Sequence, residues 1–168
     1  SKRDGFLLCE GYMDVISLHQ AGFDNAVASL GTAYTIDQAR LLKRYRNRVF
    51  LAYDSDAAGQ KAALRAIEIC RSADLSARVI SMKPYKDPDE FIKNLGAEEY
   101  EKRIANSISS VMYEIQVLAG HYHLNDPEDK TSFGREAAKR GRCKLYEKTH
   151  FRVRSWTYGN GSCFSDRL

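Results

Sequence analysis

"LAYDSDAAGQKAALRA" (51–66) is the stretch that decides how this chain folds. It starts as an apolar run, ends abruptly in Asp54 and Asp56, and continues after small residues with the spacing of a helix. An apolar run that leads directly into an amphipathic helix is typical of a buried strand in an α/β protein. Three roles stay open for the two aspartates at the junction: capping the helix, holding a metal ion or attacking a substrate.

Three further apolar runs repeat this pattern on either side of the central stretch. We expect strands at 5–10, 25–30, 48–54 and 77–82, with a helix after each of the first three. Thr35 and Gln38 have the spacing of a capping box at the start of the second helix. Apolar runs without alternation, in regular turn with helices, predict an α/β fold with a parallel four-stranded sheet and helices on both faces.

The chain after the fourth strand is expected to be a helical C-terminal extension. The sequence predicts a loop and short helix over 83–96, one long helix over 97–120 and a further helix that ends near 140. From Gly141 onward the periodicity is lost, and a divergent tail or a shifted reading frame would explain this. The expected division is therefore 1–96, 97–140 and 141–168.

Composition places the chain among ordinary globular proteins. The apolar and charged fractions are 43% and 29%, and no apolar run approaches the ~20 residues of a membrane span. There is no signal-peptide pattern, and because the first residue is Ser we expect a piece of a longer protein. The four cysteines lack CxxC spacing, so Cys9 and Cys70 are interpreted as buried reduced thiols of a cytoplasmic protein without a zinc site. The net charge of +4 permits contact with nucleic acid without arguing for it.

Carboxylates collect where the predicted strands end. Glu10 ends the first strand, Asp54 ends the third, and an acidic pair follows the fourth. The ends of parallel strands share one edge of the sheet, so we expect these acids to converge there. The full set is Glu10, Asp14, Asp54, Asp56, Asp87 and Asp89. Oxygen ligands without His or Cys suit Mg²⁺ or Mn²⁺, and such a site suits phosphoryl transfer.

Simpler interpretations of single acids stay open. Asp56 has the position of an N-cap for the following helix, and Asp87 has the same position before Pro88. Glu10, taken alone, is equally well explained as a solvated loop acid. Together, however, acids at the ends of three strands favour one shared site.

Weaker candidates surround this set. Gly31 and Thr32 follow the second strand, where backbone amides are able to meet a phosphate. Lys83 and Lys86 flank the last acidic pair and are candidates for nucleotide contacts or for pairing with Asp87. A basic cluster near the end of the second helix is either a favourable helix end or a nucleic-acid contact; its members are Lys43, Arg44, Arg46 and Arg48. The small residues 57–59 are expected to leave room for phosphates beside a metal ion.

Four motifs resemble the TOPRIM domain of bacterial DnaG-type DNA primases. They are "CEGYMDVI" (9–16), "ASLGTA" (28–33), "AYDSDAAG" (52–59) and "KDPDEF" (86–91). The glutamate and the DxD pair are shared by all TOPRIM proteins, whereas "EGYMD", "SLGT" and "DPD" are particular to primases. The resemblance covers roughly 5–118 and implies the TOPRIM fold and half of an RNA-polymerase site that makes short RNA primers on single-stranded DNA.

The resemblance also implies roles for individual residues and partners. Glu10 is implied to act in acid/base chemistry or metal binding, and Asp54 and Asp56 as metal ligands. Asp14, Asp87 and Asp89 are implied to complete a set for two or more Mg²⁺ or Mn²⁺ ions. The implied partners are ribonucleoside triphosphates, a single-stranded DNA template and a replicative helicase bound through a downstream domain. Zinc is implied only in an upstream domain, the protein is expected to be a monomer, and the fragment alone is expected to be weakly active.

Other phosphate-handling families fit less well. Haloacid dehalogenases carry DxD after the first strand with Thr or Val two residues on, whereas here the pair follows the third strand and Ala58 takes that position. Receiver domains need a lysine after a fifth strand, which the sequence does not offer. A TOPRIM nuclease, a topoisomerase, a phage primase-helicase fragment and a non-catalytic binding module stay open.

Overall fold

The structure, a computed structural model, describes residues 4–29 and 33–145 of the chain. Contacts divide the chain into two compact units, Ser1–His121 and Tyr122–Leu168. The expected division into 1–96, 97–140 and 141–168 stays a prediction.

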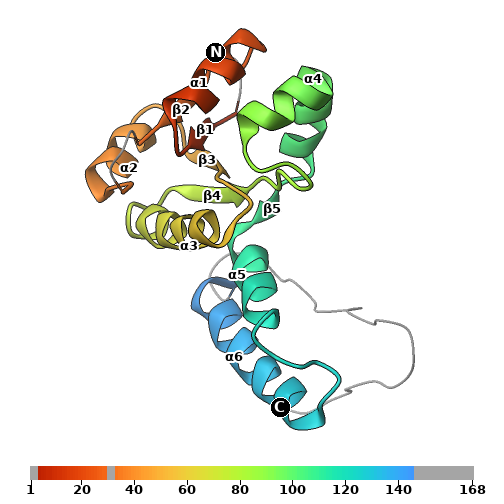
Figure 1. The fold of residues 1–168 in the computed structure, drawn as a ribbon. Helices are drawn as coiled ribbons and strands as arrows, with labels where there is room; N and C mark the ends of the chain where they lie inside the picture. Colours follow the sequence, from red (N-terminus) through yellow and green to blue (C-terminus); the bar gives the residue numbers. More distant parts are fainter. Residues whose placement is uncertain (1–3, 30–32, 146–168) are drawn as a thin grey trace. The chain divides into compact units, whose positions relative to one another are not determined.

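A five-stranded sheet forms the centre of the first unit (Figure 1). Its strands are β1 (Phe6–Cys9), β2 (Ala26–Ala28), β3 (Arg48–Ala52), β4 (Ser76–Val79) and β5 (Ile108–Ser109). They lie in the order β2-β1-β3-β4-β5; the first four are parallel, and β5 pairs antiparallel with β4. The predicted α/β fold with four parallel strands is confirmed, and the two-residue β5 extends the sheet at one edge.

Helices cover both faces of this sheet (Figure 1). They are α1 (Tyr12–Gln20), α2 (Ile36–Lys43), α3 (Ala57–Ser72), α4 (Pro88–Ala105) and α5 (Ser110–Ala119). Helices α1 and α4 pack on one face, and α2 and α3 pack on the other. None of the helices in the described part of the chain is long and apolar enough to cross a membrane.

The side chains of each central strand enter both cores in alternation. In β1, Leu7 and Cys9 join the core under α1 and α4, and Leu8 between them joins the core under α2 and α3. Burial on both faces explains why the strands are uninterrupted apolar runs rather than alternating ones. Cys9 and Cys70 are buried free thiols, as predicted.

The prediction of one long helix over 97–120 is wrong. Helix α4 ends at Ala105, the chain forms β5, and α5 starts at Ser110. Arg78 Nε donates to Ser107 Oγ at 2.8 Å, and the side chain of Ser109 caps α5. Serine side chains bind nearby backbone and so favour caps and turns over a helix interior, which outweighs the apolar spacing through this segment.

Helix α6 (Pro127–Leu145) is the helix in the described part of the second unit. Pro127 is its first helical residue, and Asp126 Oδ1 accepts from the backbone N–H of Glu128 and Asp129. The helix continues past Gly141, where the sequence showed no period. The rest of the predicted divergent tail, 146–168, lies outside the described residues.

Candidate metal and nucleotide site

The crevice between β1 and β3 is the point where the sheet changes its direction of winding. From β1 the chain crosses to β2 on one side, and from β2 it returns past β1 to β3 on the other. Ligands of parallel α/β sheets bind beyond the strand ends at such a point. Glu10 and Asp54 follow these two strands, and the backbone N–H of Asp54 donates to Glu10 Oε1 at 3.2 Å. The sequence-predicted pair therefore meets at the expected place.

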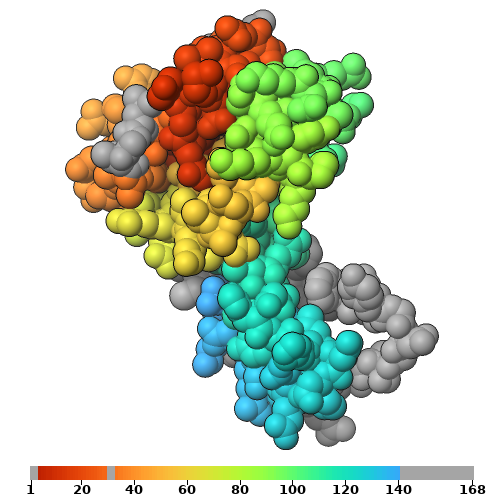
Figure 2. Space-filling view, in the orientation of Figure 1, coloured from red at the N-terminus to blue at the C-terminus, as the bar shows by residue number. Residues whose placement is uncertain are grey.

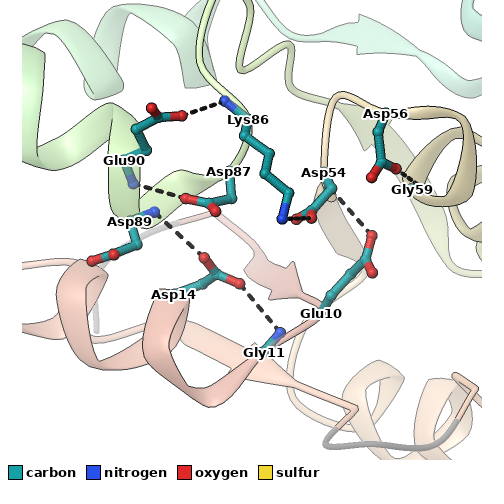
Figure 3. A network of polar contacts seen from close by, with 10 residues as sticks. All are labelled: Glu10, Gly11, Asp14, Asp54, Asp56, Gly59, Lys86, Asp87, Asp89 and Glu90. Atoms are coloured by element: carbon teal, nitrogen blue, oxygen red, sulfur yellow. Dashed lines mark hydrogen bonds and ion pairs between the residues drawn. The ribbon is translucent and has the colours of Figure 1, made fainter.

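Asp14 connects the start of α1 with the start of α4 (Figure 3). It is 7% exposed, and its carboxylate accepts from the backbone N–H of Gly11 at 3.2 Å and of Asp89 at 3.4 Å. The side chain of Asp89 in turn accepts from Ser17 Oγ and from Lys93 Nζ, the latter at 2.6 Å. Two carboxylates more than seventy positions apart in the sequence are thus held in one network.

An acidic cleft of about 500 Å³ opens at this network. In the space-filling view, α1 in red and the first half of α4 in light green lie side by side around it (Figure 2). Its lining includes five of the six predicted carboxylates: Glu10, Asp14, Asp54, Asp87 and Asp89. We call this space the acidic cleft below.

Asp56, the sixth predicted acid, does not line the acidic cleft. Its Oδ1 accepts from the backbone N–H of Gly59 at 2.8 Å as the N-cap of α3 (Figure 3). Asp56 lines a neighbouring cleft of about 420 Å³ together with Asp54 and Lys83. Asp87 caps α4 in the same way, through Glu90 N at 2.8 Å, but remains in the acidic cleft. The capping interpretation is correct for both residues.

Burial and mutual repulsion disfavour the charged forms of three cleft carboxylates, Glu10, Asp14 and Asp54. Burial raises the pKa of Glu10 and of Asp54, and neighbouring carboxylates raise both further. The pKa of Asp14 is raised to about 6, first by burial and then by Asp87 and Asp54. Lys86 Nζ, 3.5 Å from Asp54 Oδ2, works in the opposite direction and lowers the pKa of Asp54. The cleft therefore has an excess of negative charge that a cation would relieve.

The chain is similar in sequence and fold to DNA primases. A family model described as Toprim-like matches residues 7–92. The chain belongs to the Toprim-like family. The DNA primase of Clostridium acetobutylicum is 43% identical over 136 residues, which is 81% of this chain and 23% of that protein. The DNA primase of Aquifex aeolicus is 40% identical over 131 residues, 77% of this chain and 25% of that protein. This TOPRIM chain thus spans about a quarter of the length of these primases.

Solved primase structures share the fold. The E. coli primase catalytic core is 30% identical with a TM-score of 0.69, over 86% of this chain and 49% of that one. A DnaG primase catalytic domain bound to single-stranded DNA is 32% identical with a TM-score of 0.69, over 82% and 44%. The TOPRIM fold of this chain is therefore that of primase catalytic cores.

Divalent metal ions are the general cofactors of TOPRIM primases, and the donor set of the acidic cleft fits them. All of its side-chain donors are carboxylate oxygens, the ligands of hard divalent cations. Among the described residues, however, no three His, Cys, Asp or Glu side chains come close enough to enclose an ion. That agrees with Mg²⁺ chemistry, in which one or two carboxylates, several waters and substrate phosphates share the ion.

Gly59 has a different reason to be small from the one expected. A Cβ at this position would overlap the carbonyl oxygen of Asp54. The first turn of α3 therefore packs directly on the backbone that carries Asp54, and glycine is needed for that approach. The expectation that 57–59 leave room for phosphates does not apply to Gly59.

The predicted basic cluster lies away from the acidic cleft. Arg48 begins β3, at the opposite end of the strand from Asp54, and pairs with Asp4. Lys43 Nζ pairs with Asp74 Oδ2 at 2.6 Å. Gly31 and Thr32 lie outside the described residues.

Three residues of the network escaped the sequence prediction. Ser17 and Lys93 both bind Asp89, and Glu90 Oε2 accepts from the backbone N–H of Lys86 at 2.7 Å. Helical spacing offered a signal for two of them: Ser17 is three residues after Asp14, and Lys93 is four after Asp89. Nothing in the sequence alone pairs Ser17 with Asp89.

Proposed function

We propose that this chain is the TOPRIM catalytic fragment of a DNA primase, a DNA-directed RNA polymerase that makes short RNA primers on single-stranded DNA. The observation that supports this best is the acidic cleft beyond β1 and β3 in a chain whose matched relatives are DNA primases. The reaction is nucleotidyl transfer, and the substrates are ribonucleoside triphosphates.

The metal ions of this proposal are two or more Mg²⁺ or Mn²⁺. Asp54 is their central ligand because its side chain lines both the acidic cleft and the neighbouring cleft of Asp56. When bound, such ions polarise phosphate oxygens and stabilise the attacking and leaving oxygens. Glu10 accepts the Asp54 N–H and has a raised pKa, which suits either metal binding or proton transfer.

The partners proposed for the intact protein extend beyond this chain. The template is single-stranded DNA, as in the printed description of one structural neighbour. A replicative helicase is expected to bind through a downstream domain and zinc through an upstream one. The protein is expected to act as a monomer in the cytoplasm.

Manganese binding tests the site directly. We expect Asp54→Asn to weaken Mn²⁺ binding about 10–100-fold, the range seen when an important metal-site carboxylate is lost. Asp74→Asn is the matched control: it removes an equal charge from a turn where Asp74 has a φ of 52° that asparagine also adopts. The measurement is water-proton relaxation during Mn²⁺ titration. Unchanged binding in both Asp54→Asn and Asp56→Asn would refute the assignment.

Another TOPRIM activity, in a nuclease or topoisomerase, would use the same Glu10 and Asp54. The relatives at 40–43% identity favour primase, because both are DNA primases. Primer synthesis, argued below for the whole molecule, is therefore the second test.

A further inference from the structure

Another cleft, of about 380 Å³, adjoins Glu10 on the side of α3. Glu10 and Tyr53 lie along it at the sheet, and Lys61 and Arg65 line it from α3. Glu10 also lines the acidic cleft, so the two spaces share one carboxylate. We call the cleft on the side of α3 the Lys61–Arg65 cleft.

Lys61 and Arg65 are neighbouring cations without a counter-charge among the described residues. They are four residues apart on an exposed face of α3, and neither forms an ion pair with another described residue. Lysines elsewhere in the same unit behave differently: Lys86 pairs with Asp54 and Lys93 with Asp89. Two like charges at this spacing repel each other, so an anion between them is favourable.

Helix α3, which carries these two cations, is packed tightly against the rest of the unit. Ala63, Ile67 and Cys70 on its opposite face are each at most 2% exposed. The first turn packs on the backbone of Asp54, as the overlap at Gly59 shows. The bases of both side chains are therefore positioned by the same helix that begins at the metal site.

The charges of the acidic cleft and of the Lys61–Arg65 cleft favour different kinds of phosphate ligand. The acidic cleft accepts a phosphate only with metal ions to neutralise it. The Lys61–Arg65 cleft has two cations and, among its lining residues, only Glu10 as an acid. It therefore suits a phosphate without a bound metal ion. A backbone phosphodiester fits this description better than a metal-bound triphosphate does.

We propose that the Lys61–Arg65 cleft binds the backbone phosphates of a nucleic-acid strand whose adjoining nucleotide lies at the acidic cleft. This inference rests on the proposed function, because it places the reacting end of the strand on one side of Glu10, in the acidic cleft. The preceding backbone phosphates then lie on the other side of Glu10. Lys61 and Arg65 act as strand-positioning residues and contact no reacting atom.

The test is binding of a fluorescein-labelled single-stranded oligonucleotide to the whole chain, followed by anisotropy over a range of salt concentrations. We expect the double variant Lys61→Gln/Arg65→Gln to bind about tenfold more weakly at low salt, with the salt slope reduced by about one to two. Lys102→Gln/Lys139→Gln is the control, since it removes the same charge from lysines paired with glutamates elsewhere. Its affinity should fall by less than about twofold.

Mn²⁺ titration of the same variants separates this inference from the proposed function. The Lys61→Gln/Arg65→Gln variant should bind Mn²⁺ as the unaltered chain does, which also shows that it is folded. Equal loss of oligonucleotide binding in both double variants would overturn the inference, as would no binding by the unaltered chain at low salt. Loss of Mn²⁺–ATP binding with oligonucleotide binding intact would also overturn it, because the cleft would then hold the triphosphate.

Discussion

At the scale of single residues, the acidic cleft is built at the expense of stability. Asp14 is buried beside other carboxylates, and two backbone N–H groups offset only part of the cost of its charge. Such perturbed acids are typical of functional sites, where charge is arranged for a ligand and not for the fold.

The pH dependence of stability should reveal this cost. Because the pKa of Asp14 is raised from 3.8 to about 6 on folding, the folded state binds its proton more tightly. The unfolding free energy should therefore fall as the pH rises through that window. Without metal at neutral pH, Asp14→Asn should be more stable than the unaltered chain by about 1 kcal/mol, after allowance for solvent screening.

Urea denaturation in chelator at acid and neutral pH measures this difference. Near the lower end of the window the advantage of Asp14→Asn should disappear, since the unaltered residue is then protonated in both states. Asp74→Asn serves again as the control and should show no such pH-dependent gain. An equal effect of Asp14→Asn at both pH values would contradict the assignment of the cost to ionisation.

At the scale of elements, the end of β3, the start of α3 and the loop before α4 form one connected junction. Asp54 ends the β3 segment, Asp56 caps α3, and the backbone N–H of Ser55 donates to the carbonyl of Lys86 at 2.7 Å. The loop before α4 is thereby tied to the β3–α3 turn. The carboxylates at this junction are therefore held by two helices and a central strand.

Gly59→Ala should disturb this junction. An added methyl group would meet the Asp54 carbonyl, so we expect a loss of about 1–3 kcal/mol in unfolding free energy and weaker Mn²⁺ binding. Gly134→Ala in α6 is the contrast, because no atom lies within 4 Å of its added Cβ. That variant should gain up to about 1 kcal/mol of helix stability. Denaturation and Mn²⁺ titration of both variants measure the effects, and a neutral Gly59→Ala would show that α3 is free to move.

At the scale of the whole molecule, the chain matches only part of a primase catalytic core. It spans 44–49% of two primase catalytic-core chains that share its fold. Within the described residues the acidic cleft contains ligands for metal but few free cations for a template. The part of the catalytic core that this chain does not span is expected to supply most contacts with the template.

The chain alone should therefore make primers poorly while it binds Mn²⁺ well. We expect primer synthesis from a single-stranded template with labelled ribonucleotides to be weak, and to rise strongly when the upstream part of the parent protein is joined to it. Asp54→Asn in that longer protein is the control and should abolish the gain. Robust synthesis by the chain alone would contradict the expectation that most template contacts come from the part of the catalytic core that this chain does not span.

Local patterns were sufficient to determine the α/β class, the four parallel strands, the caps and the acids at strand ends. Those features depend on neighbours within a few residues, and so does the start of α6 at Pro127. The end of α4 before Ser107 and the requirement for glycine at position 59 depend on contacts with distant backbone or side chains. The periodicity of apolar residues does not reveal such contacts. Only the tertiary structure decided that Asp14 and Asp89 share a network while Asp56 lies outside the acidic cleft, because these positions follow from how helices pack on the sheet.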